Sequence, residues 1–408
     1  MSNGHTLVIP TYNRPAELRR LVRYYYTRAW PMNLLVLDSS RPGVAEENAK
    51  MLSSLGESVR HVIFPGTTPM AAKLAQGLAL VQSPYVSFCA DDDLVLPNGL
   101  REAVAFLKDH PDYVSAHGLY INFRREGHDV HLMREYAGPS NEAAHAGARI
   151  YRLLQKYESL FYGVFRTPDL REIVSAVAAL PTLHYQELFQ SAAALIKGKV
   201  FRFPRLFGAR QSCDPAEPER DKWQTYYWFA EDPAEVFEHY HAYRAALWSF
   251  YQAHAFAPLL EKEKFFKILD LAHAVYFSAS CPPEYFHSVL QPYWPDDAYV
   301  KVGDIDLFDR LGRPAAGSLP ETDAKRRRRD AQVSANSQRW SAARICEALP
   351  VALKAVLAAP ALARLNYQAR HAFRTPWRCR LSVRLRWLAG VDDFRAAYFE
   401  LCRYLDQA

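Results

Sequence analysis

Short apolar runs alternate with amphipathic segments over residues 6–109, and this alternation limits the folds that the chain can adopt. The apolar runs predict four strands: Thr6–Ile9, Asn33–Leu37, His61–Phe64 and Tyr85–Cys89. The segments between and after them predict helices that begin near Pro15, Val44, Met70 and residue 98. A β-α alternation of this length predicts an α/β fold, with a mostly parallel sheet covered by helices on both faces.

Polar side chains follow three of these strands directly. Thr11–Arg14 follow the first strand, Asp38 and Ser39 the second, and Asp91–Asp93 the fourth. Right-handed crossovers place the carboxyl ends of parallel strands at one edge of the sheet, where such folds bind ligands. We therefore expect these residues to form a site. Asn13 is expected to cap the following helix and Pro15 to open it.

Asp91, Asp92 and Asp93 are three consecutive carboxylates, which repel one another. One interpretation is a Mg²⁺ or Mn²⁺ site that offsets the repulsion and also binds a diphosphate. The other is a solvated acidic turn. Neither a G-x-G-x-x-G run after the first strand nor a G-x-x-x-x-G-K-[ST] run occurs, which disfavours a dinucleotide dehydrogenase or a P-loop enzyme.

Four segments, in this order and spacing, resemble family 2 glycosyltransferases of the GT-A fold. They are Val8–Arg14, Leu35–Ser40, Met70–Leu78 and Tyr85–Pro97, and the resemblance extends over about residues 5–215. It implies a Rossmann-like, mostly parallel sheet with flanking helices. It also implies transfer of a sugar from a UDP-, GDP- or dTDP-linked donor to a hydroxyl of a glycan, lipid-linked glycan or protein, with inversion as the family default.

The resemblance also implies roles for individual residues. Donor contacts fall on Pro10, Thr11, Tyr12, Arg14, Asp38, Lys73, Asp91, Asp92 and Arg210, with Asp38 reading the base or ribose. Mn²⁺ or Mg²⁺ contacts fall on Asp91, Asp92 and Asp93. The family commonly has Asp-x-Asp-Asp where this chain has Ala90 and then three aspartates. The acidic pair is therefore either Asp91 with Asp93, by spacing, or one that includes Asp92, by alignment to the following proline.

An inverting transfer needs a carboxylate base, which the family places at a helix start after the sheet. Glu187, in the amphipathic stretch 181–189, matches that position, and the alternative interpretation is an ordinary helix glutamate. His184 is the second candidate, although we expect a capping or packing role for it. Arg210 either reaches the diphosphate or is an exposed loop arginine. The aromatic residues of 161–166 predict a strand whose rings belong mainly to the core.

The sequence predicts four regions. They are a GT-A domain at 1–215, a helical domain at 216–311, a linker at 312–338 and a basic helical region at 339–408. From Lys325 to Arg386 there are 15 Lys and Arg residues against two acids. This segment is either a solvated basic face or a peripheral contact with an anionic membrane that presents a lipid-linked acceptor. No nucleic-acid partner is expected, because no recognition module appears.

The compartment predicted from the sequence is the cytoplasm, with the inner membrane surface as an alternative. We expect no secretory leader and no membrane-spanning run, and the six cysteines are dispersed without a CxxC pair. Two other functions stay open: a nucleotidyltransferase, which usually needs a glycine-rich basic loop, and a catalytically silent module that binds a nucleotide sugar or a partner.

Overall fold

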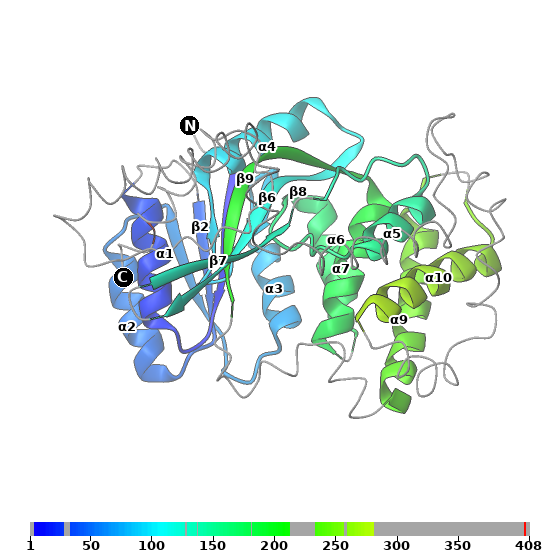
Figure 1. Ribbon diagram of the computed structural model, residues 1–408. Coiled ribbons are helices and arrows are strands. Elements are labelled where there is room, and N and C mark those ends of the chain that lie inside the picture. Colours follow the sequence, from blue (N-terminus) through cyan, green and yellow to red (C-terminus); the bar gives the residue numbers. More distant parts are fainter. Residues whose placement is uncertain are drawn as a thin grey trace, which may run out of the picture.

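The sheet and its flanking helices are seen in a computed structural model of the chain (Figure 1). It describes residues 4–27, 33–126, 129–136, 138–180, 182–212, 233–256, 259–280 and residue 404. The predicted linker, the aromatic stretch at 223–229 and the basic C-terminal helices lie outside these residues. The fold prediction is confirmed: a mostly parallel mixed sheet is flanked by helices, and further helices follow it.

Four parallel strands form the first half of the sheet. They are β1 (His5–Thr11), β2 (Asn33–Asp38), β3 (Val59–Ile63) and β4 (Tyr85–Phe88). The second half holds β5 (Leu94–Val95), β6 (Tyr113–Glu126), β7 (Asp129–Tyr136), β8 (Val164–Arg166) and β9 (Lys199–Gln211). In the described residues the strand order is β3-β2-β1-β4-β8-β6-β9-β5, with β7 paired to β6. The short β8 is antiparallel to both of its neighbours.

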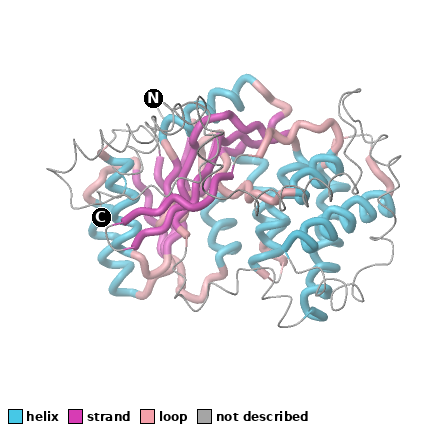
Figure 2. Tube along the Cα trace, in the orientation of Figure 1, coloured by secondary structure: helices cyan, strands magenta, loops and turns pink. Residues whose placement is uncertain are grey.

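The helices of the N-terminal part begin close to the predicted positions. They are α1 (Pro15–Tyr26), α2 (Pro42–Ser53), α3 (Met70–Ala79) and α4 (Pro97–Asp109). Later helices are α5 (Ala146–Gln155), α6 (Thr167–Val177), α7 (Leu183–Lys197), α9 (Pro233–His254) and α10 (Lys262–Ser280). Proline stands in the first turn of α1, α2, α4 and α6, where its missing N–H costs no helical bond. Figure 2 shows the strands together, with the later helices gathered on one side.

The sheet separates two hydrophobic clusters, and β1 contributes to both. Leu7 and Ile9 pack in the cluster beneath α1 and α4, whereas Val8 packs in the cluster that reaches α3, α6 and α7. Successive side chains of a strand point to opposite faces, so a strand covered on both sides reads as an unbroken apolar run. This is why the first strand lacks polar alternation.

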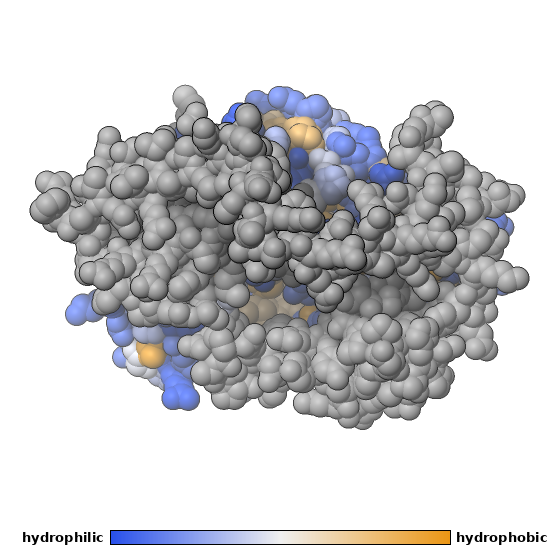
Figure 3. Space-filling model, in the orientation of Figure 1, coloured by the Kyte–Doolittle hydropathy of each residue, from blue (hydrophilic) through white to orange (hydrophobic). Residues whose placement is uncertain are grey.

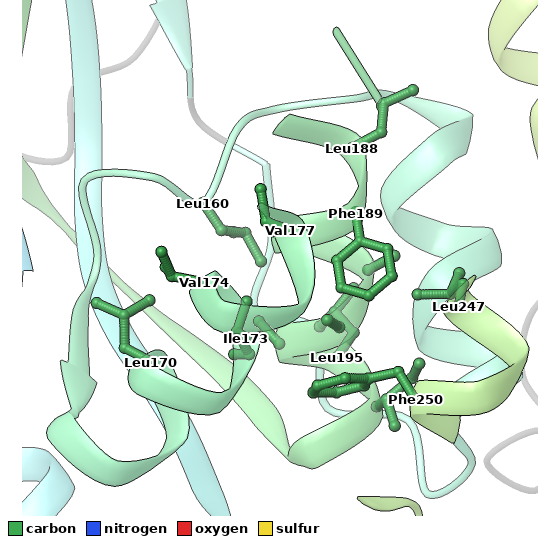
Figure 4. Close-up of a cluster of buried hydrophobic side chains, with 14 of the residues drawn as sticks. Leu160, Leu170, Ile173, Val174, Val177, Leu188, Phe189, Leu195, Leu247 and Phe250 are labelled. Carbon is green, nitrogen blue, oxygen red and sulfur yellow. The ribbon is translucent and has the colours of Figure 1, made fainter. Parts of the chain in front are cut away.

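The helices after the sheet extend the second cluster. Phe250 and Leu247 of α9 belong to the same group of buried side chains as Phe189 and Leu195 of α7 and Ile173 of α6 (Figure 4). In addition, α10 packs against α5. The division into domains at residue 215 stays a prediction, and α9 and α10 share a core with the helices that precede it.

To span a membrane, a helix needs about 20 consecutive, mostly apolar residues. None of the helices within the described residues is long and apolar enough to do so. Hydrophilic residues cover α4 at the top of the face in Figure 3, with a small hydrophobic area among them. Exposed Arg101 and Lys108 belong to this helix.

Candidate active site

The carboxyl ends of β1, β2 and β4 lie side by side, as the alternation predicted. Thr11 is in register with Asp38 across the β1–β2 pair. On the other side of β1, the Thr11 hydroxyl donates a 2.7 Å hydrogen bond to Asp91 Oδ2. Polar residues that are up to 80 positions apart in the sequence therefore meet at one edge of the sheet.

The turn after β1 is fastened to the turn after β2. Asn13 has a positive φ of 54°, a left-handed conformation that asparagine tolerates better than most residues. Its N–H donates to Ser40 Oγ at 2.8 Å, and its Oδ1 accepts from the Arg41 N–H at 2.9 Å. The prediction that Asn13 caps α1 is wrong: Arg14 holds the cap position, without a side-chain cap bond, because the Asn13 amide is used by the neighbouring turn.

Asp38 is fully buried, and both of its carboxylate oxygens have partners within the protein. Oδ1 accepts from the Ser40 N–H at 2.8 Å, while Oδ2 contacts Asn48 Nδ2 at 2.8 Å and His61 Nε2 at 3.1 Å. Burial opposes the negative charge, but the hydrogen bonds from His61, Ser40 and Asn48 prevail and hold the pKa of Asp38 below its usual range. The carboxylate thus braces the turn after β2, and its contact with a base or ribose stays a prediction.

Lys73 places a buried cation beneath the same edge. Its side chain is almost inaccessible, and Nζ donates to the Thr11 carbonyl at 3.1 Å and to Ser39 Oγ at 2.8 Å. Burial lowers the pKa of Lys73, whereas the charges of Asp38 and Asp91 raise it. The ammonium therefore ties the ends of β1 and β2 together and contributes positive potential to the edge.

The three aspartates point to three different environments. Asp91 accepts from Thr11 and lies 3.5 Å from Arg14 Nη1, whereas Asp92 Oδ2 lies 2.6 Å from the same nitrogen. Asp93 turns the other way: Oδ1 accepts from the Gln211 N–H at 2.7 Å, and Oδ2 accepts a short bond from the Tyr162 hydroxyl. The triplet therefore links the turn after β1 to the end of β9.

Burial and mutual repulsion act together on two of these groups. Burial raises the pKa of Asp91 to about 7 and that of Asp93 to about 7, and the neighbouring charge of Asp92 adds to both shifts. Asp91 and Asp93 are almost inaccessible, while the Asp92 side chain is 19% exposed. The electrostatics of the triplet favour an added positive charge.

The end of β1 and the turn after it hold the other residues that are predicted to lie along the nucleotide. Pro10 is buried within β1, opposite Leu37. Tyr12 is 51% exposed just beyond the strand, and the Arg14 side chain is 44% exposed. Of this group, Tyr12 and Arg14 are free to contact a ligand from solvent, whereas Pro10 contributes to the strand.

Arg210 is within electrostatic reach of both Asp93 of the acidic triplet and the predicted base, Glu187. It comes from β9, and its guanidinium carbon is 5.0 Å from the centre of the Tyr162 ring. Burial opposes its charge, but Tyr162, Asp93 and Glu187 raise the pKa of Arg210 above its usual range. Arg210 is therefore partly buried and is not an exposed loop arginine, and its contact with the diphosphate stays a prediction.

Glu187 lies in the first turns of α7, as predicted. Its Oε1 accepts a 3.0 Å hydrogen bond from the Tyr157 hydroxyl, which also lies 3.3 Å from Ser191 Oγ. His184 has a packing role instead: its ring stacks on Tyr276, and burial lowers its pKa to about 4. Glu187 is therefore a partly exposed carboxylate that Tyr157 holds in place and that interacts electrostatically with Arg210.

The oxygens at this edge suit a hard divalent cation that is shared with a ligand. Among the described residues no group of three or more His, Cys, Asp or Glu side chains is arranged to hold a metal ion. Mg²⁺ sites commonly use only one or two carboxylates and complete their coordination with substrate phosphates and water. Asp91, Asp92 and Asp93 offer hard oxygen donors suited to that second kind of site, and burial together with the charge of Asp92 raises the pKa of Asp91 and of Asp93.

Several residues that shape the site were not found from the sequence. Tyr157 and Tyr162 bind Glu187 and Asp93, and Arg20 donates to the Asp92 carbonyl at 3.4 Å and to Gln211 Oε1 at 3.1 Å. Tyr162 was placed among core aromatics, and the other two carried no motif or periodicity that could have marked them. Their partners are 30 to 191 positions away, so local patterns hold no signal for these contacts.

Comparisons with known proteins agree with the family resemblance. Residues 6–167 match the family model described as Glycosyl transferase family 2. No curated protein matches the chain. Among solved structures, the S. aureus TarS fragment 1–349 is 13% identical, with a TM-score of 0.46, and the match covers 75% of this chain and 78% of that one.

The same fragment was also solved with ligands. Its complex with UDP-GlcNAc has a TM-score of 0.46 at 13% identity, covering 75% of this chain and 79% of that one. Its complex with UDP has a TM-score of 0.42 at 12% identity, covering 75% and 78%. At these identities and TM-scores the likeness has no bearing on substrate.

Proposed function

Because residues 6–167 of this chain belong to glycosyl transferase family 2, we propose that this glycosyltransferase moves a sugar from a nucleotide-diphosphate donor to a hydroxyl acceptor. One observation carries the proposal: Arg210 lies over the Tyr162 ring, Tyr162 donates to Asp93, and the charges of Asp93 and Glu187 both raise the pKa of Arg210. A cation-binding edge and a carboxylate base are the two groups that an inverting transfer needs. In this chain both groups interact electrostatically with Arg210.

The donor nucleotide is proposed to lie across the ends of β1 and β2. Exposed Tyr12 offers an aromatic face for a base, and Arg14 offers a guanidinium that matches phosphate oxygens. Lys73 supports this edge from below by holding Thr11 and Ser39 in place. Asp38 acts through the turn that it braces or through a direct contact with the ribose or base.

The diphosphate is proposed to lie over the acidic triplet. Asp91, Asp92 and Asp93 would hold Mn²⁺ or Mg²⁺, which supplies positive charge to the departing diphosphate. Arg14 already neutralises Asp91 and Asp92 in part. Arg210 adds a positive charge that interacts with Asp93 of the triplet and with Glu187.

Glu187 is proposed to take the proton from the acceptor hydroxyl as the hydroxyl attacks the anomeric carbon. The Tyr157 hydroxyl fixes one carboxylate oxygen, so the other is left to point toward the acceptor. Attack from the side opposite the diphosphate inverts the configuration. The acceptor is proposed to be a glycan or lipid-linked glycan, and membrane contact through the basic region would bring the enzyme to the latter.

The experiment is a thermal-shift titration with UDP, GDP, dTDP and their sugars, with and without Mn²⁺. A ligand that binds only the folded protein raises the melting temperature, and we expect one nucleotide to do so in a metal-dependent way. Asp92→Asn should remove most of that metal-dependent shift. Asp109→Asn, at an exposed carboxylate near the end of α4, is the matched control and should keep it.

The outcomes separate the proposal from its alternatives. A nucleotide shift without any turnover of a nucleotide sugar would favour the catalytically silent module, because binding would then exist without transfer. No shift with any nucleotide would sink the proposed function. An equal shift in wild type and Asp92→Asn would exclude Asp92 from the metal site.

A further inference from the structure

Tyr404, near the C-terminal end of the chain, is buried against α1 of the catalytic domain. Its side chain is 0% exposed and belongs to the hydrophobic cluster beneath α1 and α4. Its ring meets the Tyr24 ring edge to face, with the ring centres 5.8 Å apart. The residue is thus built into the N-terminal part of the fold, 384 positions after Arg20.

Tyr404 makes a second contact, with the buried guanidinium of Arg20. Arg20 Nη2 donates to the Tyr404 hydroxyl at 3.0 Å, and the guanidinium carbon lies 4.6 Å from the centre of the tyrosine ring. The tyrosine therefore offers both an acceptor and a π face to the same cation. Because Arg20 is only 2% exposed, water cannot readily replace these contacts.

Arg20 carries this contact to the acidic triplet. The same Nη2 atom lies 3.4 Å from the Asp92 carbonyl and 3.1 Å from Gln211 Oε1. Gln211 in turn donates its N–H to Asp93. A single residue, Arg20, therefore connects Tyr404 to the backbone of Asp92 and to Gln211 at the end of β9.

The neighbouring residues of α1 support the same loop. The Tyr25 hydroxyl donates to the Val95 carbonyl at 2.7 Å and accepts from the Val95 N–H at 3.2 Å. Arg20, Tyr24 and Tyr25 thus form one buried face of α1 behind residues 92–95. Tyr404 covers that face, which explains why so polar a group as Arg20 can remain there.

We propose that Tyr404 is a positioning residue of the donor site, which holds Arg20 against the loop that presents Asp92 and Asp93. The proposal rests on the proposed function for its effect on catalysis, and on the contacts above for its effect on the loop. Tyr404 contacts α1, and Figure 1 shows α1 and α10 at opposite ends of the molecule.

The test uses the full-length protein with Tyr404→Phe, which keeps the ring and removes the hydroxyl. Arg20→Lys removes the planar guanidinium and is the second variant. Tyr26→Phe, at a 58% exposed tyrosine of the same helix, is the matched control. Hydrogen–deuterium exchange of residues 90–96 reports on the loop whether or not the protein is an enzyme.

We expect faster exchange of residues 90–96 in Tyr404→Phe and in Arg20→Lys, with wild-type rates in Tyr26→Phe. The KM for the donor should rise about tenfold, as for other residues that support metal ligands, while the KM for the acceptor stays unchanged. A general loss of stability would not separate the two KM values. The double variant should lose no more than the worse single variant, because both act through one contact.

Wild-type exchange of the loop in both variants would overturn the proposal, and so would equal increases in the two KM values. If the wild-type protein binds no nucleotide at all, the proposed function fails, and the exchange experiment still decides the role of Tyr404. Should Tyr404→Phe be too unstable to purify, Arg20→Lys alone decides the outcome by the same two measurements.

Discussion

Asp91, Asp92 and Asp93 are chemically identical side chains, but each has a different environment. Asp91 and Asp93 are buried and have raised pKa values of about 7, whereas Asp92 is partly exposed and paired with Arg14. The three residues lie in the turn between β4 and β5, and their separate contacts with Thr11, Arg14 and Tyr162 give them these different environments. Which of the three aspartates form the acidic pair stays a prediction.

At the same scale, the proposed base can be tested by Glu187→Gln. The amide keeps the shape and can still accept from Tyr157, but it cannot take a proton. We expect kcat to fall by about 10²- to 10⁴-fold, the range for loss of a general base, while donor binding is unchanged. Steady-state rates with a saturating donor and nucleotide titration calorimetry measure the two effects separately.

The control for this substitution is Glu172→Gln, at a half-exposed glutamate of α6 that pairs with Lys197. It should leave kcat unchanged. Turnover of Glu187→Gln at the wild-type rate would assign the base role to another residue. A matching loss of donor affinity would instead indicate that Glu187 supports the fold of the site.

Among the elements, those whose partners are nearby in sequence were predictable. The strands from β1 to β4 were found from apolar runs, and the helices between them were found from apolar residues at helical spacing and, for α1, from Pro15. The pairing of β6 with β9 and the insertion of β8 were not, because they join segments tens of residues apart through backbone hydrogen bonds. Hydrophobic periodicity indicates that a strand is buried, but it does not indicate which other strand pairs with it.

The candidate site divides in the same way. Thr11, Asp38 and the triplet were predictable, since each follows a strand whose direction the alternation determines. Tyr157, Tyr162 and Arg20 were not, because their roles come only from tertiary contacts with Glu187, Asp93 and Asp92. Polar residues at strand ends can be recognised from the local sequence. The residues that hold them in place through tertiary contacts cannot.

The contact between β6 and β9 predicts a strict requirement for glycine at residue 118. A Cβ atom there would lie 2.4 Å from the Arg205 carbonyl oxygen and 3.0 Å from the Phe207 Cβ, where the register of the two strands shifts. The Arg205 carbonyl belongs to the backbone of β9, so it cannot move away from the added Cβ as a flexible side chain could. Gly118→Ala should therefore lower the free energy of unfolding by about 1–3 kcal/mol, as for an overpacked core.

Urea unfolding measures this change, and Gly43→Ala in α2 is its control. An added Cβ at residue 43 meets no atom within 4 Å, so we expect unchanged or slightly raised stability from the improved helix propensity. Equal stability of Gly118→Ala and wild type would show that β6 and β9 separate more easily than their packing implies.

For the whole molecule, the continuity of the core bears on the predicted domain boundary. Buried side chains of α9 and α10, including Tyr243 and Phe265, belong to the cluster that also contains Val8 and Val86 of the sheet. An independent domain would have its own core and few contacts across the boundary. The packing therefore predicts that residues 233–280 and the sheet unfold together.

Leu247→Ala tests this cooperativity. Leu247 is fully buried on α9, and its truncation should cost about 2–5 kcal/mol through lost burial and the cavity left behind. If the sheet and α9 form one cooperative unit, native-state hydrogen exchange should show the slowest amides of β1 and β2 losing as much protection as those of α9. Ser249→Ala, at an exposed position of the same helix, should change neither. Loss of protection confined to α9 and α10 would instead show that the boundary at residue 215 separates two units of independent stability.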